Sequence, residues 1–442
     1  MLKTFKLGGV HPPENKISAQ AAIKKLDIPA TVSVPVSQHI GAPATLLVKR
    51  KDKVKVGQLI AETSGFISAN IHSPVSGIVK KIGPVYNAGG YKNTAVIIKV
   101  EGDEWDESVD TDPAIKREIE ATPEEIIEKT KKNGIVGMGG ATFPSHVKLS
   151  PPKGKTAEVL IINGVECEPY LTSDHRLMIE KAEELIIGTQ IIMKALKINK
   201  SYIGIENNKP DAIDLLTKAT SGMNIKVVPL KVKYPQGGEK QLIKSVINRE
   251  VPSGTLPIEV GAVVHNVGTA VAVYEAVQKN KPLVERVVTI TGKSVKNPSN
   301  FMVRIGTPVS DLIEAAGGMP EDTGKIISGG TMMGKALSST DAPVTKGTSG
   351  IVLIPTEESQ RREIKPCIRC SKCITVCPMG LEPYLLMTLT QKDMYEREEK
   401  ERVMDCIECG SCSYTCPADR PLLDYIRLGK KRVGQAIRER NS

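Results

Sequence analysis

The chain has 442 residues, of which 40% are hydrophobic and only 3% aromatic, and it carries a formal net charge of +10. This length exceeds a single hydrophobic core, so we expect two to four domains. The first residues lack the apolar core of a signal peptide and no apolar run approaches about 18 residues, which predicts a cytosolic chain without a membrane span. Few aromatic side chains argue against nucleic-acid binding, which uses them to stack on bases.

Residues 1–112 are predicted to form a β domain. Short alternating strands, such as 31–34 and 44–48, are separated by glycine and proline turns. The stretch 54–79 resembles the barrel-sandwich hybrid fold of biotinyl and lipoyl carrier domains. In those carriers the tip of a hairpin presents a lysine for modification, but the corresponding tip here, at 65–67, has none. The resemblance therefore implies a carrier fold with a structural or docking role.

Residues 113–280 are predicted to form a Rossmann-like α/β domain. A capping box at 122–125 begins the first helix, with proline at its first position. Strand-like and helix-like runs then alternate, which predicts a parallel sheet covered by helices. The predicted strands are 159–163, 202–206, 227–230 and 262–265, and the predicted helices are 174–196, 210–219 and 239–248.

Two loops of this domain are candidate parts of a nucleotide site. The first, 134–148, contains closely spaced glycines, whose backbone N–H groups can approach a phosphate, and it ends with the cation of Lys148. The second, 163–169, follows a predicted strand at the edge of the sheet where ligands bind in open α/β folds.

These loops resemble the flavin- and NADH-binding subunit of respiratory complex I, in which a G-x-G-G-A-G-F-P-x-x-x-K loop precedes the motif N-x-D-E-x-E-P. The resemblance implies FMN and NAD(H) as cofactors, with Lys148 near the FMN phosphate and Phe143 at the nicotinamide nucleotide. No side chain is predicted to be catalytic, because hydride transfer needs no side-chain acid. The implied cofactor-binding residues are Gly137, Gly139, Gly140, Ala141, Phe143, Lys148, Asn163, Glu166, Glu168, Gly238, Glu239, Asn266 and Thr269.

Residues 281–355 resemble the β-grasp (SLBB-like) module that follows the flavin domain in the same family. We expect strands at 287–292 and 326–330 with a short helix at 310–316 between them. The module is interpreted as a rigid spacer, with a ligand site as the alternative.

Residues 356–420 contain eight of the nine cysteines, in two copies of the pattern C-x2-C-x2-C-x3-C-P. This is the ligand run of bacterial ferredoxins, in which the fourth cysteine of each run binds the other [4Fe–4S] cluster. We therefore predict an α-helical ferredoxin domain that holds two clusters. The predicted ligands are Cys367, Cys370, Cys373 and Cys416 for one cluster, and Cys406, Cys409, Cys412 and Cys377 for the other.

Zinc and disulfides are the alternatives for these cysteines. Zinc sites pair two C-x2-C units across a longer gap, and disulfides between such close cysteines would be strained. Residues 421–442 are predicted to form a basic C-terminal tail. A solvated surface, an acidic protein partner and anionic lipid headgroups remain open for that tail.

The whole chain is thus predicted to be a multidomain α/β protein, and its domain order resembles the C subunit of the Rnf electron-transport complex. Residues 8–16 and 329–334 belong to the same resemblance. It implies a peripheral subunit at the cytoplasmic face of the cell membrane, within a complex that couples ferredoxin:NAD oxidoreduction to sodium or proton pumping. The implied partners are the other subunits of that complex, including an iron–sulfur subunit that exchanges electrons with ferredoxin.

Two alternatives to this interpretation stay open. The first is a cobalamin reductase of the microcompartment type, which combines similar flavin, β-grasp and ferredoxin parts. The second is an electron-transfer or docking protein without nucleotide binding, because Met138 and Val165 depart from the flavin-domain pattern.

Overall fold

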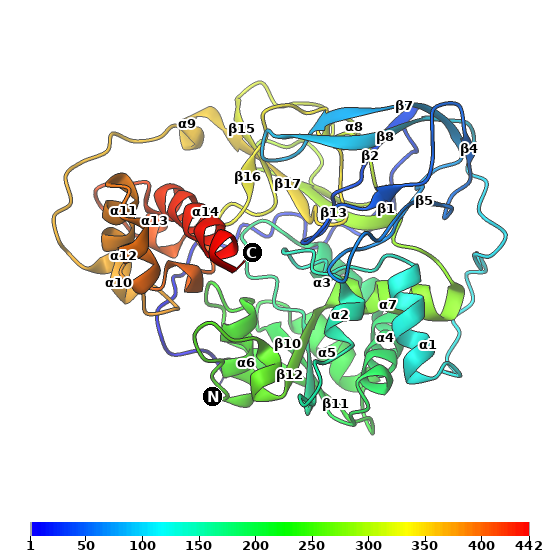
Figure 1. Cartoon of the computed structure of the whole chain (residues 1–442), viewed down its shortest axis with the longest axis horizontal. Coiled ribbons are helices and arrows are strands. Elements are labelled where there is room, and N and C mark those ends of the chain that lie inside the picture. The colour runs from blue at the N-terminus through cyan, green and yellow to red at the C-terminus, as the bar shows by residue number, and fades with distance from the viewer. Residues whose placement is uncertain (1, 442) are drawn as a thin grey trace.

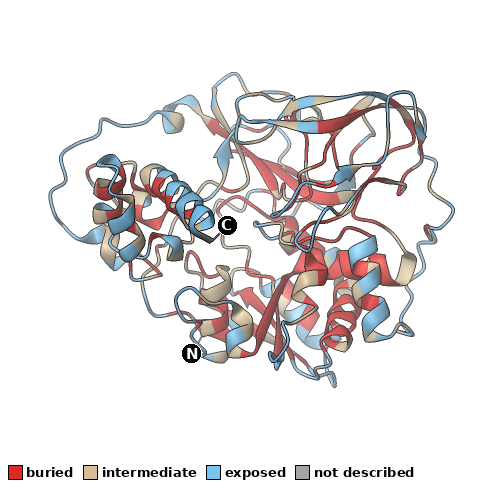
Figure 2. Ribbon diagram, viewed as in Figure 1, coloured by how far each residue is buried: buried red, intermediate tan, exposed pale blue. Residues whose placement is uncertain are grey.

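The computed structural model describes residues 2–441 as an α/β body with a smaller helical unit at one side (Figure 1). Buried residues are concentrated in the sheets and in the helices that cover them, and in the inward faces of the helical unit (Figure 2). Among the described helices, none combines the length and the apolar character that crossing a bilayer requires.

The central domain is built on a four-stranded sheet with the order β11-β10-β9-β12. Its strands are β9 (Val159–Asn163), β10 (Ser201–Glu206), β11 (Ile225–Leu230) and β12 (Ala262–Asn266). Each neighbouring pair is parallel, which confirms the sheet predicted from the alternation of strands and helices. Asn163 and Asn266 are partners in the register of β9 and β12, so the carboxyl ends of these two strands lie side by side.

Helices cover both faces of this sheet. They are α1 (Pro123–Lys132), α2 (Ser145–Lys148), α3 (Ser173–Glu180), α4 (Ala182–Ala195), α5 (Pro210–Ala219), α6 (Glu239–Ile247), the 3-10 helix η1 (Pro257–Val260) and α7 (Val267–Lys279). The predicted capping box of α1 is confirmed, because the Thr122 and Glu125 side chains each accept the other's backbone N–H. The predicted helix over 174–196 is divided at Lys181 into α3 and α4.

The barrel-sandwich domain packs two antiparallel sheets around a core that includes Val32, Ile60, Ile71 and Ile98. One sheet has the order β2-β8-β7-β4 and the other β3-β5-β6. The strands are β2 (Thr31–Pro35), β3 (Thr45–Leu46), β4 (Lys53–Val54), β5 (Leu59–Glu62), β6 (Ile71–His72), β7 (Gly77–Tyr86) and β8 (Lys92–Val100).

The segment before β2 contributes to neither of those sheets. Its strand β1 (Ile23–Lys25) pairs in parallel with β14 of the β-grasp module. Upstream, Lys3 and Val10 form isolated bridges with Leu230 and Tyr234 of the central domain. The first residues therefore pair with the β-grasp module and the central domain.

The β-grasp module forms a six-stranded sheet with the order β1-β14-β13-β17-β15-β16. Its own elements are β13 (Glu285–Thr291), β14 (Ser299–Arg304), α8 (Val309–Ala315), β15 (Thr323–Ser328), β16 (Lys335–Ala336), β17 (Gly350–Pro355) and α9 (Thr356–Ser359). The strands and the short helix predicted for this module are present in the predicted order.

The helical unit contains α10 (Lys372–Thr375), α11 (Pro383–Gln391), α12 (Tyr395–Lys400), the 3-10 helix η2 (Val403–Asp405), α13 (Ser411–Tyr414) and α14 (Leu422–Asn441). Its last helix corrects the prediction of a separate basic tail. Leu422, Ile426 and Val433 share one face of α14, and that face is buried in the same apolar cluster as Leu386 of α11. The basic residues of this helix are partly engaged as well, because Arg427 and Lys430 pair with Glu408 of the second cysteine run.

Candidate functional site

The glycine loop between α1 and α2 presents free backbone donors to solvent. Gly139, Gly140 and Ala141 are exposed, and within residues 2–441 their N–H groups donate to no protein acceptor. Gly140 has φ +138°, and a Cβ at this position would meet no atom within 4 Å. The loop therefore offers three neighbouring N–H groups in an open cradle, an arrangement that suits a phosphate.

Three predicted site residues, Gly137, Phe143 and Thr269, hold this loop in place. The Gly137 N–H donates to the carbonyl of Phe143 at 2.8 Å. The Met138 N–H donates to the Thr269 hydroxyl at 2.9 Å, which fastens the loop to the first turn of α7. Thr269 thus acts on the loop backbone, and Met138, which replaces the arginine of the complex I pattern, is buried beneath it.

Lys148 and Glu239 meet beside this loop. Lys148 Nζ lies 2.7 Å from Glu239 Oε1 and donates to the carbonyl of Val264 at 3.1 Å. Both side chains are about one-third exposed, at 30% and 39%. An ammonium group has three N–H donors, so one donor of Lys148 remains for an anion.

The two asparagines at the carboxyl ends of β9 and β12 fix the adjoining backbone. Asn266 caps α7, because its Oδ1 accepts the Gly268 N–H at 2.8 Å. A Cβ added to Gly139 would lie only 3.1 Å from Asn266 Cβ, so the glycine loop packs closely on this cap. Asn163 Nδ2 donates to the carbonyl of Gly237 at 2.9 Å, which positions the turn that precedes Gly238 and α6.

Glu166 caps the next helix. Its carboxylate accepts the N–H groups of Asp174 and His175 at 2.8 and 3.1 Å, at the N-terminus of α3. Asp174, which the sequence reasoning missed, lies beside Glu166, and its Oδ2 accepts from Asn266 Nδ2 at 2.6 Å. Burial, together with the nearby Glu166 charge, raises the pKa of Asp174 to about 7.

Glu168 faces the helical unit and the β-grasp module. Its carboxylate accepts the backbone N–H groups of Met332 and Met333 at 3.0 and 2.9 Å. The Tyr234 hydroxyl lies 3.1 Å from Glu168 Oε1 and 2.8 Å from the carbonyl oxygen of Cys409. Burial raises the pKa of Glu168. This carboxylate therefore joins three parts of the chain at one point.

Two lysines that were not predicted from the sequence hold the 163–169 loop by donating hydrogen bonds to its backbone carbonyl oxygens. Lys16 Nζ donates to the carbonyl oxygens of Glu166, Glu168 and Leu171 at 2.7–2.9 Å. Lys209 Nζ donates to the carbonyl of Val165 at 2.9 Å. Burial lowers the pKa of Lys16 to about 8. The only feature of the sequence that could have indicated this role was the position of Lys16 inside the 8–16 motif.

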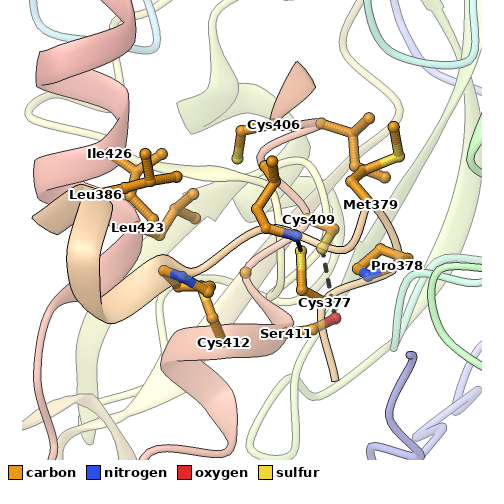
Figure 3. A pocket seen from close by; sticks show the side chains of 14 residues that line it. Cys377, Pro378, Met379, Leu386, Cys406, Cys409, Ser411, Cys412, Leu423 and Ile426 are labelled. Atoms are coloured by element: carbon orange, nitrogen blue, oxygen red, sulfur yellow. Dashed lines mark hydrogen bonds between the residues drawn. The ribbon is translucent and has the colours of Figure 1, made fainter. Parts of the chain in front are cut away.

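Cys377, Cys406, Cys409 and Cys412, which we call the inner set, line one cavity in the helical unit (Figure 3). Cys377 comes from the first cysteine run and the other three from the second, so the structure brings together the four residues that the crossed pairing requires. The remaining lining is apolar and includes Leu381, Leu386, Ile407, Leu423 and Ile426.

Backbone N–H groups point at the sulfur atoms of this cavity. The Leu381 N–H donates to Cys377 Sγ and the Glu408 N–H donates to Cys406 Sγ, both at 3.4 Å. Such bonds tune the reduction potential of a cluster. Burial raises the pKa of the Cys406 thiol to about 11, so binding of iron there must release a proton. An apolar cavity with four thiols and N–H···S donors fits an iron–sulfur cluster.

The other four cysteines, Cys367, Cys370, Cys373 and Cys416, form the outer set. Cys373 and Cys416 pack at the edge of the apolar core of the helical unit, and burial, with a smaller effect of the nearby Cys416, raises the pKa of Cys373. Cys367 and Cys370 are exposed. Within the described chain, no group of three or more Cys, His, Asp or Glu side chains converges tightly enough to hold a single metal ion.

The two cysteine runs repeat the same backbone path. The residue two after the first cysteine has positive φ in both runs, Arg369 at 55° and Glu408 at 57°. The residue after the second cysteine does so as well, Ser371 at 59° and Gly410 at 78°. A short helix, α10 or α13, follows in each run. The sequence repeat is therefore a structural repeat.

The inner set abuts the central domain. The N-terminal segment passes between them, where the Gly9 N–H donates to the carbonyl of Val376 at 2.9 Å. Gly8 has φ +67°, and a Cβ there would lie 2.5 Å from the Cys377 carbonyl carbon, so the segment and the cysteine loop touch. From α6, Gln241 Nε2 donates to the carbonyl of Pro378 at 3.2 Å.

Four family models match the chain, in the order of the predicted domains. They are described as RnfC Barrel sandwich hybrid domain (residues 3–103), Nuo51 FMN-binding domain (130–275), SLBB domain (287–336) and 4Fe-4S dicluster domain (360–417).

Three curated relatives are similar over most of their length. The chain is 49% identical over 403 residues to the C subunit of the proton-translocating ferredoxin:NAD(+) oxidoreductase complex of Clostridium ljungdahlii, covering 91% of this chain and 87% of the relative. It is 44% identical over 436 residues to the C subunit of the Na(+)-translocating ferredoxin:NAD(+) oxidoreductase complex of Acetobacterium woodii, covering 97% of each. It is 42% identical over 392 residues to the C subunit of the ion-translocating oxidoreductase complex of Rhodobacter capsulatus, covering 87% of this chain and 75% of the relative.

Proposed function

The chain belongs to the family of C subunits of ion-translocating ferredoxin:NAD(+) oxidoreductase complexes, and we propose that it is the component that exchanges electrons with NAD(H). The observation that carries this proposal is one chain that combines a glycine loop with three free N–H donors and an apolar four-cysteine cavity next to the same domain. The family membership also displaces the cobalamin reductase alternative.

The residues that would hold FMN surround the glycine loop. Gly139, Gly140 and Ala141 would donate their N–H groups to the phosphate, and Lys148 would supply its remaining N–H donor. FMN, when bound, accepts a hydride and passes on electrons singly, which a nicotinamide cannot do. Other residues shape this site through the contacts described above, and they are Gly137, Phe143, Asn163, Gly238, Glu239, Asn266 and Thr269.

Glu166 and Glu168 have a positioning role in this proposal. Glu166 accepts two N–H groups of α3, and Glu168 accepts those of Met332 and Met333. Both carboxylates are therefore engaged with the protein, and they keep the 163–169 loop in shape at the edge of the nucleotide site. Phe143, at the end of the glycine loop, is assigned to the nicotinamide nucleotide.

The eight cysteines of the two runs would hold the two [4Fe–4S] clusters, with the inner set nearer the central domain. Tyr234, Glu168 and the Gly8–Gly9 backbone connect the flavin-binding domain to the inner set, because their contacts lie between the two. The outer set, two of whose cysteines are exposed, would exchange electrons with a partner protein.

The other components of the membrane complex are the partners in this proposal. The relatives are named as C subunits of ion-translocating complexes, so this chain is assigned a peripheral position on such a complex. We assign it to the cytoplasmic face, where NAD(H) is available. The pumping of sodium ions or protons would then take place in the membrane-embedded subunits.

The test is anaerobic purification followed by reconstitution with FMN. We expect about eight iron atoms and one FMN per chain, and bleaching of the flavin absorbance on addition of NADH. Protein that binds FMN but does not respond to NADH contradicts the nucleotide role. Lys148→Ala is expected to lower FMN occupancy, and Lys155→Ala, which removes another lysine paired with a glutamate, is the matched control.

A further inference from the structure

The hairpin tip of the barrel-sandwich domain is an exposed apolar surface. Phe66 is 75% exposed and Ile67 39%, and the neighbouring Ile40 is 49% exposed. The chain has only four phenylalanines, and two of them, Phe5 and Phe301, are buried. An exposed phenylalanine at the tip of a carrier-like hairpin therefore needs an explanation other than packing.

The backbone of this tip is tightly fixed. The Ala42 N–H donates to the carbonyl of Ile67 at 3.0 Å, and the Ala69 N–H donates to His39 Nε2 at 3.1 Å. Gly41 has φ +110°, and a Cβ there would lie 2.0 Å from the Ile67 oxygen, so only glycine permits this close approach. Phe66 is therefore presented from a defined loop.

The tip also adjoins the glycine loop of the nucleotide site. The Ile40 N–H points at the carbonyl of Thr142 at 3.4 Å, and the Phe66 backbone lies near the imidazole of His146 at the start of α2. Figure 1 shows the dark blue loops near β5 reaching the cyan segment around α2. The hairpin tip that carries Phe66 therefore contacts the glycine loop at Thr142, and Gly139 of the same loop packs on Asn266.

From this placement we propose that Phe66 stacks against the adenine ring of NAD(H). The inference deepens the proposed function and rests on it. NAD(H) has a nicotinamide and an adenine joined through a pyrophosphate. If the nicotinamide is held at the flavin on one side of the glycine loop, the adenine lies on the opposite side of that loop. Adenine has flat apolar faces, and an exposed aromatic ring is the surface that they bind. The barrel-sandwich domain therefore supplies one wall of the nucleotide site.

Reduced nicotinamide mononucleotide provides the decisive probe, because it donates the same hydride but lacks the adenosine half. In FMN-reconstituted whole chain, Phe66→Ala is expected to raise the NADH concentration for half-maximal flavin bleaching about tenfold. The value for the mononucleotide should not change. Phe66→Trp should retain the wild-type value for NADH, because an indole offers a larger stacking face.

Leu256→Ala is the matched control, since Leu256 is a 66% exposed apolar side chain of the central domain. An equal loss for NADH and the mononucleotide in Phe66→Ala, or no loss for either, overturns the assignment. Unchanged NADH affinity with failure to assemble on the membrane subunits assigns the tip to docking and also overturns it. Wild-type protein that binds FMN but is not bleached by NADH rejects the proposed function itself.

Discussion

The inner and outer cysteine sets share one ligand spacing but have different surroundings. Cys377, Cys409 and Cys412 of the inner set are only 7–8% exposed, whereas Cys367 and Cys370 of the outer set are exposed. The inner set is enclosed by apolar side chains and is linked to the central domain through Tyr234. Identical sequence motifs can therefore provide an internal and an external electron-transfer position, and only the packing around them decides which is which.

Burial also changes what each site can do. The apolar shell and the N–H···S bonds of the inner set control solvent access, which tunes the potential of a cluster. The outer set begins in the wholly exposed stretch 361–372, which carries the basic residues Arg361, Arg362, Lys365, Arg369 and Lys372. A positive, exposed loop around a redox site favours rapid association with an acidic partner surface.

The strongest test of this comparison removes one ligand from each set. Cys409→Ser is expected to abolish reduction of the outer cluster by NADH, because the inner site lies between it and the flavin-binding domain. Cys370→Ser should leave reduction of the inner cluster by NADH intact. Electron paramagnetic resonance of each cluster, with FMN content as the folding control, measures both effects. Normal outer-cluster reduction in Cys409→Ser contradicts the assigned order.

The exposed loop gives a second test. Changing Arg362, Lys365 and Arg369 to glutamate is expected to slow electron transfer to the membrane subunits about tenfold at low ionic strength, and less at high salt, where charges are screened. Flavin bleaching by NADH should not change, because that reaction takes place in the flavin-binding domain, away from this loop. Stopped-flow measurements at several salt concentrations report both rates.

A matched control for this variant changes three exposed basic residues of the barrel-sandwich domain, Lys49, Arg50 and Lys53, to glutamate. It has the same net charge change at a different surface. If both triple variants slow the transfer equally, overall charge matters and the loop has no special role.

A smaller effect is expected at the contact between the inner set and the central domain. Tyr234→Phe removes the hydroxyl shared by Glu168 and the Cys409 carbonyl, which leaves buried acceptors with one partner fewer and costs about 1–3 kcal/mol. The potential of the inner cluster should shift while that of the outer cluster stays constant. Redox titration of both clusters makes the comparison, and a shift of both equally argues against a local role.

The smallest expected effect is on the stability of the helical unit, which carries both cysteine sets. Glu398 of α12 is fully buried against α14 and accepts the Thr390 O–H at 2.7 Å. Burial raises the pKa of Glu398 above its value in the unfolded chain. The folded protein is therefore more stable when Glu398 is protonated, and this part of the free energy of unfolding is lost as the pH rises through the raised pKa. Glu398→Gln should therefore melt a few degrees higher than the wild type at pH 8, with the difference shrinking toward pH 5. A difference that stays constant with pH excludes this titration.

Local sequence patterns predicted many elements of the fold correctly. The strand β9 and the helix α5 have the predicted bounds, and the α1 capping box forms as expected. These elements depend on hydrophobic alternation and on cap residues within a few positions, which a single sequence displays. The basic tail was misjudged because its charged residues were weighed more heavily than the apolar spacing of Leu422, Ile426 and Val433.

Site residues were harder to predict because their partners are distant in sequence. Lys16 bonds the carbonyls of a loop about 150 residues away, and Asp174 meets Asn266 across the sheet edge. The partner of Glu168 is a turn of the β-grasp module more than 160 residues downstream. No local pattern encodes such contacts, since they arise only when separate domains close on one another.

The sequence by itself determined the chemistry available to this protein: cysteine spacing for two clusters and a glycine loop suited to a phosphate. These follow from bond lengths and backbone conformations that operate over a few residues. The tertiary structure alone decided that one cysteine set is enclosed and the other open, and that Phe66 stands beside the glycine loop. Such assignments depend on which surfaces are buried together, and burial is a property of the folded chain as a whole.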